Sequence, residues 1–246
     1  VIDGATNVTS GVAAGTQPVA AAGNPATNKI YVANNASANV TVIDGAANTT
    51  ATVAAGTQPG SVGVNPVTNK IYVGNNGSAN VTVIDGATNT PTTVTAGSGI
   101  KSVAVNAATN TIYVGNFGSN NVTVINGATN ATATVAAGTN PVAVAVNPAS
   151  NKVYVANSGS NNVTVIDGAN NSTTTVAAGN SPQAVAVNPA TNKIYVPNSS
   201  SSNVTVIDGA TNSVVATVNL GTHPQGVGVN PSINSTIQGC AFAVNG

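Results

Sequence analysis

The sequence repeats itself every 41 residues, and this repeat limits the possible folds more than any other feature. A tripeptide, Ile-Tyr-Val or Val-Tyr-Val, recurs at that step with its tyrosine at Tyr31, Tyr72, Tyr113, Tyr154 and Tyr195. An Asp-Gly pair recurs at the same step, at Asp3, Asp44, Asp85, Asp167 and Asp208, with Asn126 in the remaining position. Six periods fill the 246 residues, so the pattern returns to its starting point. A repeat of this length predicts an array of one supersecondary unit.

Each repeat contains four short strand signals separated by turn signals. In the fourth full copy, residues 142–146 alternate Val with Ala, and residues 147–151 contain the turn pair Asn-Pro. Residues 152–156, 163–166 and 173–176 predict three more strands, and a tight hairpin turn at Asp167-Gly168, which glycine permits, joins the last two. Four antiparallel strands per repeat are typical of a propeller blade.

We therefore predict an all-β, six-bladed β-propeller with four antiparallel strands per blade. It occupies residues 1–246 as a single domain, and both chain ends close its last blade. The first strand carries small residues that suit the crowded inner edge, and the tyrosine column is expected to be core. A β-solenoid has a shorter repeat with fewer strands, and two immunoglobulin-like domains do not predict closure after six units.

Composition excludes several classes of partner. The chain has five basic and five acidic residues, and charged residues make up 4% of it, so we expect no nucleic-acid partner. No apolar run is long enough to span a bilayer, so we expect no membrane insertion. The chain contains no Met, which predicts a processed, secreted chain or a segment of a longer protein. Cys240 is the only cysteine and is expected to be a buried small residue or to form an intermolecular bridge.

The second strand of each repeat resembles that of the YVTN family of β-propeller repeats. The matching tetrapeptides are Tyr31-Val32-Ala33-Asn34, Tyr72-Val73-Gly74-Asn75, Tyr113-Val114-Gly115-Asn116, Tyr154-Val155-Ala156-Asn157 and Tyr195-Val196-Pro197-Asn198. The turn before this strand and the Val-Thr-Val-Ile-Asp-Gly segment after it also match, and the resemblance covers five repeats. The sixth copy departs from the pattern after Asn230-Pro231, where neither the tyrosine nor the Ile-Asp-Gly is found.

The resemblance implies an extracellular, secreted or cell-surface location, because members of the family are common among secreted and surface-layer proteins. It does not choose a function, because related propeller families also include lyases and redox enzymes.

The residue types argue against catalysis. The chain contains no Glu, one His and one Cys, so zinc ligation and paired-carboxylate catalysis lack their parts. The Asp residues belong to different blades and diverge, which does not suit a calcium site. A Ser-His-Asp triad could use only His223, and no Asp is expected on its face. We predict that the protein is not an enzyme and binds no metal or cofactor.

The two faces of the predicted propeller differ in charge. The lysines of the Asn-Pro turns and the aspartates of the Asp-Gly turns are expected on one face as exposed pairs. The loops between blades lie on the other face and predict a ligand site at the channel mouth, formed by Gln17, Gln58, Lys101, Asn140 and His223. These residues are otherwise ordinary loop residues, and Phe117 is a further candidate contact on this face.

Each repeat also contains an Asn-Val-Thr sequon at the start of its third strand. The candidate glycosylation sites are Asn39, Asn80, Asn121, Asn162 and Asn203. The alternative interpretation is that Asn-Val-Thr-Val is simply the strand sequence of the repeat.

Two classes of function remain. The first is an extracellular structural or adhesive surface protein that forms a homo-oligomer or polymer such as a filament or array. The second is a small-molecule or glycan-binding propeller that uses the channel mouth. Long uniform loops favour the first class, and His223 and Lys101 favour the second.

The chain ends add a hypothesis about assembly. The repeat pattern places the break inside the third strand of the sixth blade, of which residues 1–3 remain. The unpaired strand edges predict either closure within one chain or strand addition from a neighbouring copy.

Overall fold

The computed structural model describes residues 5–230 and Cys240–Ala241. The described residues form β-strands and connecting segments without helices, so no helix in this part is long and apolar enough to cross a membrane. The chain divides into two compact units, Val1–Thr95 and Ala96–Gly246, and each is described by itself. Whether the whole chain is a single domain stays a prediction.

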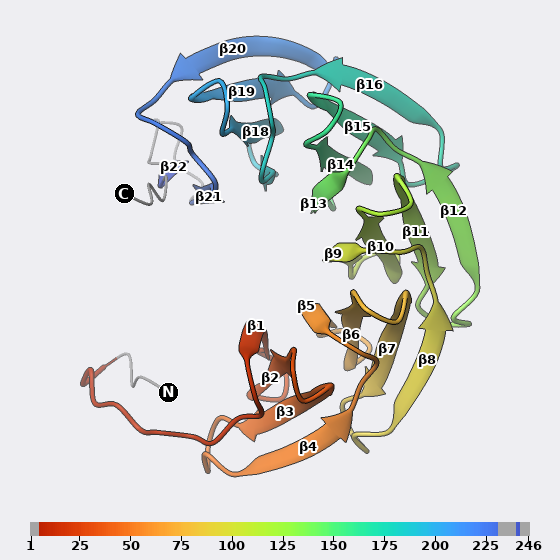
Figure 1. Ribbon diagram of the computed structural model, residues 1–246, viewed down its shortest axis with the longest axis vertical. Coiled ribbons are helices and arrows are strands. Elements are labelled where there is room, and N and C mark those ends of the chain that lie inside the picture. The colour runs from red at the N-terminus through yellow and green to blue at the C-terminus, as the bar shows by residue number, and fades with distance from the viewer. Residues whose placement is uncertain (1–4, 231–239, 242–246) are drawn as a thin grey trace. The chain divides into compact units, whose positions relative to one another are not determined.

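The first unit contains two four-stranded antiparallel sheets, each in chain order (Figure 1). Their strands are β1 (Pro18–Asn24), β2 (Lys29–Asn34), β3 (Asn39–Asp44) and β4 (Thr50–Ala54), then β5 (Pro59–Asn65), β6 (Lys70–Asn75), β7 (Asn80–Asp85) and β8 (Pro91–Thr95). We call each four-stranded sheet a blade. The two blades pack with their first strands, β1 and β5, side by side.

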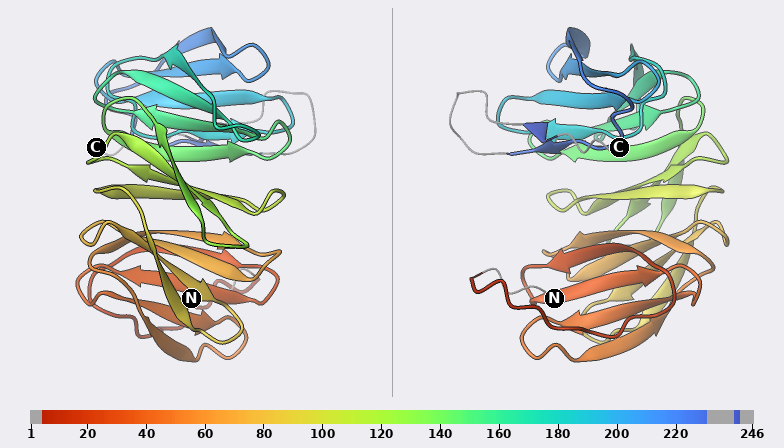
Figure 2. Two further views of the ribbon diagram at one scale, coloured as in Figure 1. Left: turned by 90° about the vertical axis from the view of Figure 1, so that its right-hand side faces the viewer. Right: turned by 60° about the vertical axis from the view of Figure 1, so that its left-hand side comes forward.

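The second unit contains three further blades and one smaller sheet (Figure 2). The strands are β9 (Ile100–Asn106), β10 (Thr111–Asn116), β11 (Asn121–Asn126), β12 (Thr132–Ala136), β13 (Pro141–Asn147), β14 (Lys152–Asn157), β15 (Asn162–Asp167), β16 (Thr173–Ala177), β17 (Ala186–Asn188), β18 (Lys193–Asn198), β19 (Asn203–Asp208), β20 (Ser213–Asn219), β21 (Gly228–Val229) and β22 (Cys240–Ala241).

The prediction of six four-stranded blades is wrong for the described residues, which form five. After the fifth blade only the two-stranded sheet β21–β22 follows. The physical reason lies in the sequence, since the sixth copy has neither the tyrosine strand nor the Ile-Asp-Gly strand after Asn230. Residues 1–3 and the remainder of the sixth copy, apart from β22, lie outside the described residues, as does the side chain of Cys240.

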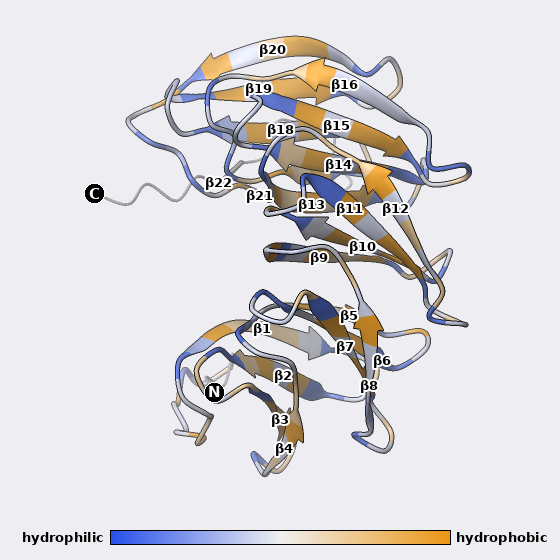
Figure 3. Ribbon diagram, turned by 45° about the vertical axis from the view of Figure 1, so that its right-hand side comes forward, coloured by the Kyte–Doolittle hydropathy of each residue, from blue (hydrophilic) through white to orange (hydrophobic). Residues whose placement is uncertain are grey.

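The predicted strands and their antiparallel order are confirmed in the five blades. In the fourth blade Lys152 pairs with Asp167 and Asn157 with Asn162, so β14 and β15 are in register from end to end. The second and third strands of each blade have mainly hydrophobic residues in the middle and polar residues at their ends, and the turns are largely hydrophilic (Figure 3). The strand ends are therefore where the polar contacts of each blade form.

The connection between the third and fourth strands differs from the predicted hairpin turn. Residues 168–172 separate β15 from β16, and the left-handed residue of this connection is Asn171, with φ 62°, not Gly168. The Asp167 carboxylate anchors the connection by accepting the Ala169 N–H at 2.8 Å. Glycine is needed for space, because a Cβ at position 168 would lie 2.6 Å from the carbonyl oxygen of Asn151.

Asn126 replaces the aspartate of this connection in the third blade. Its Oδ1 accepts the N–H groups of Ala128 at 2.9 Å and Thr129 at 3.2 Å. Asp44 makes the same two bonds in the first blade, to Ala46 and Ala47, and these bonds hold the pKa of its carboxyl below the usual value. An acceptor oxygen is what the position requires, which explains why Asn substitutes for Asp there.

Four of the five second-strand tyrosines, Tyr31, Tyr72, Tyr113 and Tyr154, are core residues, as predicted, and Tyr195 of the fifth blade is half-buried. Tyr154 is fully buried and packs on its own blade and on the next one, in a cluster with Ala156, Val163, Val165, Val176, Ile194, Val196 and Ile207. Its hydroxyl lies beside the following blade, 2.8 Å from where a Cβ at Gly209 would be. Burial, followed by the charge of Asp208, raises the pKa of Tyr154 to about 12.

We predict that the buried tyrosines resist ionisation until the fold opens. The neutral phenol fits the core, so its contribution to stability is present below the ordinary pKa of about 10 and is lost as pH rises through the raised value. Absorbance titration followed with circular dichroism should show tyrosinate forming near pH 12, together with loss of the strand signal. Tyr154→Phe should move this transition to higher pH. Ionisation of the four buried tyrosines near pH 10 in a folded chain would contradict the prediction.

Candidate functional site

The loop that enters each blade is fixed by a left-handed residue, which is the position predicted to line a ligand site. Its φ lies between 53° and 68° at Gln17, Gln58, Gly99, Asn140, Ser181 and His223. In the fourth blade the Asn140 carbonyl accepts the Ser158 N–H of the β14–β15 loop at 3.0 Å. The loop entering a blade therefore lies on the same face as its second loop, as predicted.

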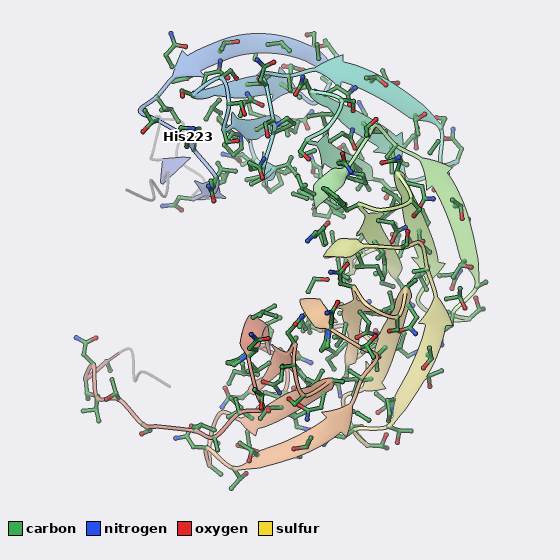
Figure 4. The ribbon with its side chains drawn as sticks, in the orientation of Figure 1. His223 is labelled. Atoms are coloured by element: carbon green, nitrogen blue, oxygen red, sulfur yellow. The ribbon has the colours of Figure 1, made fainter. Side chains whose placement is uncertain are left out.

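The backbone conformation explains why a histidine fits at position 223. It is exposed, on the segment between β20 and β21 (Figure 4). Its φ of 53° belongs to the left-handed region, where His and Asn occur more often than most residues. It lies 42 residues after Ser181 instead of 41, because β20 has a bulge opposite Val206 and Ile207.

Two of the predicted ligand residues, Lys101 and Asn140, both contact Phe117 in the second unit. Asn140 Nδ2 donates to the carbonyl oxygen of Phe117 at 3.4 Å, and Lys101 Nζ lies 5.6 Å from the centre of the Phe117 ring. Lys101 is exposed and Phe117 is half-buried. An ammonium group over an aromatic face is a favourable arrangement worth about 0.5–1 kcal/mol at an exposed site.

Gln17 and Gln58 are exposed loop residues of the first unit. A single site that joins all five candidates therefore stays a prediction. Sequence reasoning included Phe117 only as a possible contact, whereas in the structure its ring lies near Lys101 and its backbone carbonyl accepts a hydrogen bond from Asn140. The departure of its Gly-Asn-Phe-Gly loop from the other repeats was the available signal.

The sequon residues belong to a buried network at the start of each third strand. In the fourth blade Asn157 Nδ2 donates to Asn162 Oδ1 and to Thr164 Oγ1, both at 2.9 Å. Thr164 Oγ1 also accepts the Gly138 N–H at 3.2 Å, and Ser160 Oγ accepts the Thr139 N–H at 2.9 Å. The first and last residues of the Asn-Val-Thr sequon thus hold the entering loop on its blade.

The same network occurs in all five blades. Its central bond, from the buried second-strand Asn to the sequon Asn, measures 2.8 or 2.9 Å throughout; it joins Asn34 to Asn39, Asn75 to Asn80, Asn116 to Asn121, Asn157 to Asn162, and Asn198 to Asn203. The sequon Asn side chains are half-buried. The structure supplies an internal role for these residues, and their glycosylation stays a prediction.

The opposite face carries a lysine and an aspartate in four of the five blades, as predicted, but Lys29 and Lys152 bond to backbone carbonyls. Lys29 Nζ donates to the Gly86 carbonyl at 2.8 Å, and Lys152 Nζ donates to the Gly209 carbonyl at 2.7 Å, both in the following blade. Lys193 instead forms an ion pair with Asp208 of its own blade, with Nζ and Oδ2 2.5 Å apart. Sequence spacing could not reveal bonds whose acceptors are backbone carbonyls of another blade.

Acidic, histidine and cysteine side chains do not gather in groups of three or more within the described part of the chain. The expectations that the protein binds no metal and is not an enzyme stay predictions.

Comparison with known proteins gives the fold class. The structure is similar to a functionally unknown protein from Desulfotomaculum acetoxidans, with a TM-score of 0.70, 16% identity, and coverage of 84% of this chain and 71% of that one. It is similar to Kuenenia stuttgartiensis hydrazine synthase, with a TM-score of 0.56, 16% identity, and coverage of 91% and 92%.

A third similar structure is the dihydro-heme d1 dehydrogenase NirN, with a TM-score of 0.71 and 17% identity; 81% of this chain matches 46% of that one. Neither a family model nor a curated protein sequence matches the chain. The repeated four-stranded blades and these likenesses define a β-propeller-like fold.

We predict that the buried amide network is essential for blade stability. Asn157→Ala removes the donor shared by Asn162 and Thr164 and should lower the free energy of unfolding by about 1–3 kcal/mol. Thr174→Ala, on an exposed position of β16, is the control and should change it by less than about 0.5 kcal/mol. Urea denaturation measures both, and equal effects would contradict the role given to the network.

Proposed function

We propose that this chain is an extracellular structural or adhesive surface protein that assembles with copies of itself. The observation that carries the proposal is the repeated network of the second-strand Asn, the sequon Asn and the sequon Thr, with bond lengths that hardly change between blades. The polar side chains of the loops are used to hold the blades, which suits a protein whose function is its own architecture.

Composition supports the same interpretation. Only 4% of the residues are charged, so long-range repulsion between copies is weak, and backbone and amide groups dominate the surface chemistry. Three large apolar side chains of the outermost strand β20, Val214, Val215 and Val218, are 44–52% exposed. Exposed apolar residues on one strand suit an interface better than a free surface.

The finer form of the fold is part of the proposal. We propose membership of the YVTN repeat family, a sixth blade that contains β21 and β22, and completion of that blade by residues 1–3. The extracellular location follows from that family resemblance, and glycans on the five sequons would add hydrophilic surface.

A second candidate function is small-molecule or glycan binding at the loop face. The cluster of Lys101, Phe117 and Asn140 favours it, because an aromatic ring with adjacent polar groups suits a sugar. Lys101 and Phe117 have no counterpart in the other repeats, and a specific site is expected to break the repeat in this way.

Electron cryomicroscopy of the native material, with immunogold labelling of intact cells, tests the proposal. We expect ordered filaments or sheets outside the cell, because self-assembly through repeated blades produces extended arrays. Isolated single-chain particles that carry a ligand at Lys101 and Phe117 would overturn the proposal and support the binding function.

A further inference from the structure

The fourth blade shows how a blade is covered by its successor. Val176 of β16 is 6% exposed and packs in one cluster with Ile194 and Ile207 of the fifth blade. Lys152 Nζ reaches across to the Gly209 carbonyl at 2.7 Å and to Asn212 Oδ1 at 3.0 Å. An apolar contact and a charge-assisted hydrogen bond therefore join consecutive blades.

The first unit repeats this arrangement with the same covering sequence. Lys29 Nζ donates to the Gly86 carbonyl, and Ile84 packs in the cluster of Tyr31. The covering segments, residues 83–89 and 206–212, both read Val-Ile-Asp-Gly-Ala-Thr-Asn. One seven-residue sequence thus supplies both the isoleucine and the carbonyl acceptor in the two units.

The fifth blade has the same valine and lysine as the fourth blade, but their surroundings differ. Val218 is equivalent to Val176, because each pairs with the valine that follows the sequon Asn, yet Val218 is 44% exposed. Lys193 is equivalent to Lys152 but bonds to Asp208 of its own blade at 2.5 Å. The fifth blade therefore carries the same valine and lysine as a covered blade, but its valine is exposed and its lysine bonds within the blade.

Residues 1–7 read Val-Ile-Asp-Gly-Ala-Thr-Asn, identical to both covering segments. We propose that the fifth blade binds residues 1–7 of a second copy, with Ile2 covering Val218 and Lys193 exchanging Asp208 for the Gly4 carbonyl. Asn7 has a φ of 56°, within a degree of the 55° of Asn212, which ends the segment that covers the fourth blade. The end of residues 1–7 therefore already has the backbone conformation of a covering segment.

This inference rests on the proposed self-assembly and specifies its joint. The contact is head to tail, because the fifth blade of one copy binds the first residues of the next. Such a contact continues through successive copies and extends the assembly. Each joint adds a covering segment to an exposed sheet face, as consecutive blades do within one chain.

Carbodiimide cross-linking of mixed isotope-labelled copies tests the joint. Light and 15N-labelled full chains are mixed, assembled and treated to link amines to adjacent carboxylates. We expect Lys193–Asp3 cross-links between light and heavy chains. Lys193–Asp3 links confined to chains of one isotope would show closure within a chain and overturn the proposal, as would Lys193–Asp208 as the sole Lys193 link in assembled material.

Two lysine variants separate the joint from general stability. Lys193→Ala should raise the concentration for half-assembly about tenfold, the effect of one charge-assisted hydrogen bond, with little change in the thermal stability of the dilute chain. Lys152→Ala should lower thermal stability and leave the light–heavy cross-link in place. Lys193→Arg should restore assembly, because the guanidinium also donates to a carbonyl.

The outcomes distinguish this joint from the proposed function. Filaments without light–heavy Lys193–Asp3 links would overturn the joint and leave self-assembly standing. Failure of the chain to assemble at any concentration would overturn both.

Discussion

The second-strand tyrosine of a blade is buried because the isoleucines of the next blade cover it, and the rest of the structure depends on this cover. Ile194 and Ile207 pack on Tyr154 and exclude it from solvent. The nearby Lys152 holds the two blades together by its bond to the Gly209 carbonyl. Glycine is required there because Tyr154 Oη and Asn192 Oδ1 occupy the space that a Cβ would need. The glycine is therefore required by packing inside its own blade, where Asn192 lies nearest, and by packing between blades.

Within a blade, a buried amide performs the corresponding task. Asn157 holds Asn162 and Thr164, and Thr164 holds the loop at Gly138. These bonds use the side chains of the Asn-Val-Thr sequon, which the sequence alone marks as a candidate glycosylation site. The protein thus combines an apolar contact between blades with an amide network inside each one, and both recur with the period of the sequence.

Much of the fold could be predicted because the period and the turn residues determine it locally. Asn-Pro and Asp-Gly mark the strand ends, and the five blades follow from them. The sixth blade could not be predicted correctly, because residues 232–246 lack those signals. The partner of Lys152 and the contacts of Phe117 with Lys101 and Asn140 join segments far apart in sequence, which spacing does not specify.

The central claim is that a blade becomes more stable when its successor covers it. Hydrogen–deuterium exchange of the fourth and fifth blades, in dilute and assembled samples, tests it most directly. In the dilute chain the amides of β18 and β19 should exchange faster than those of β14 and β15, and assembly should remove the difference. Equal protection of the two blades in the dilute chain, or a difference that persists after assembly, would contradict the claim.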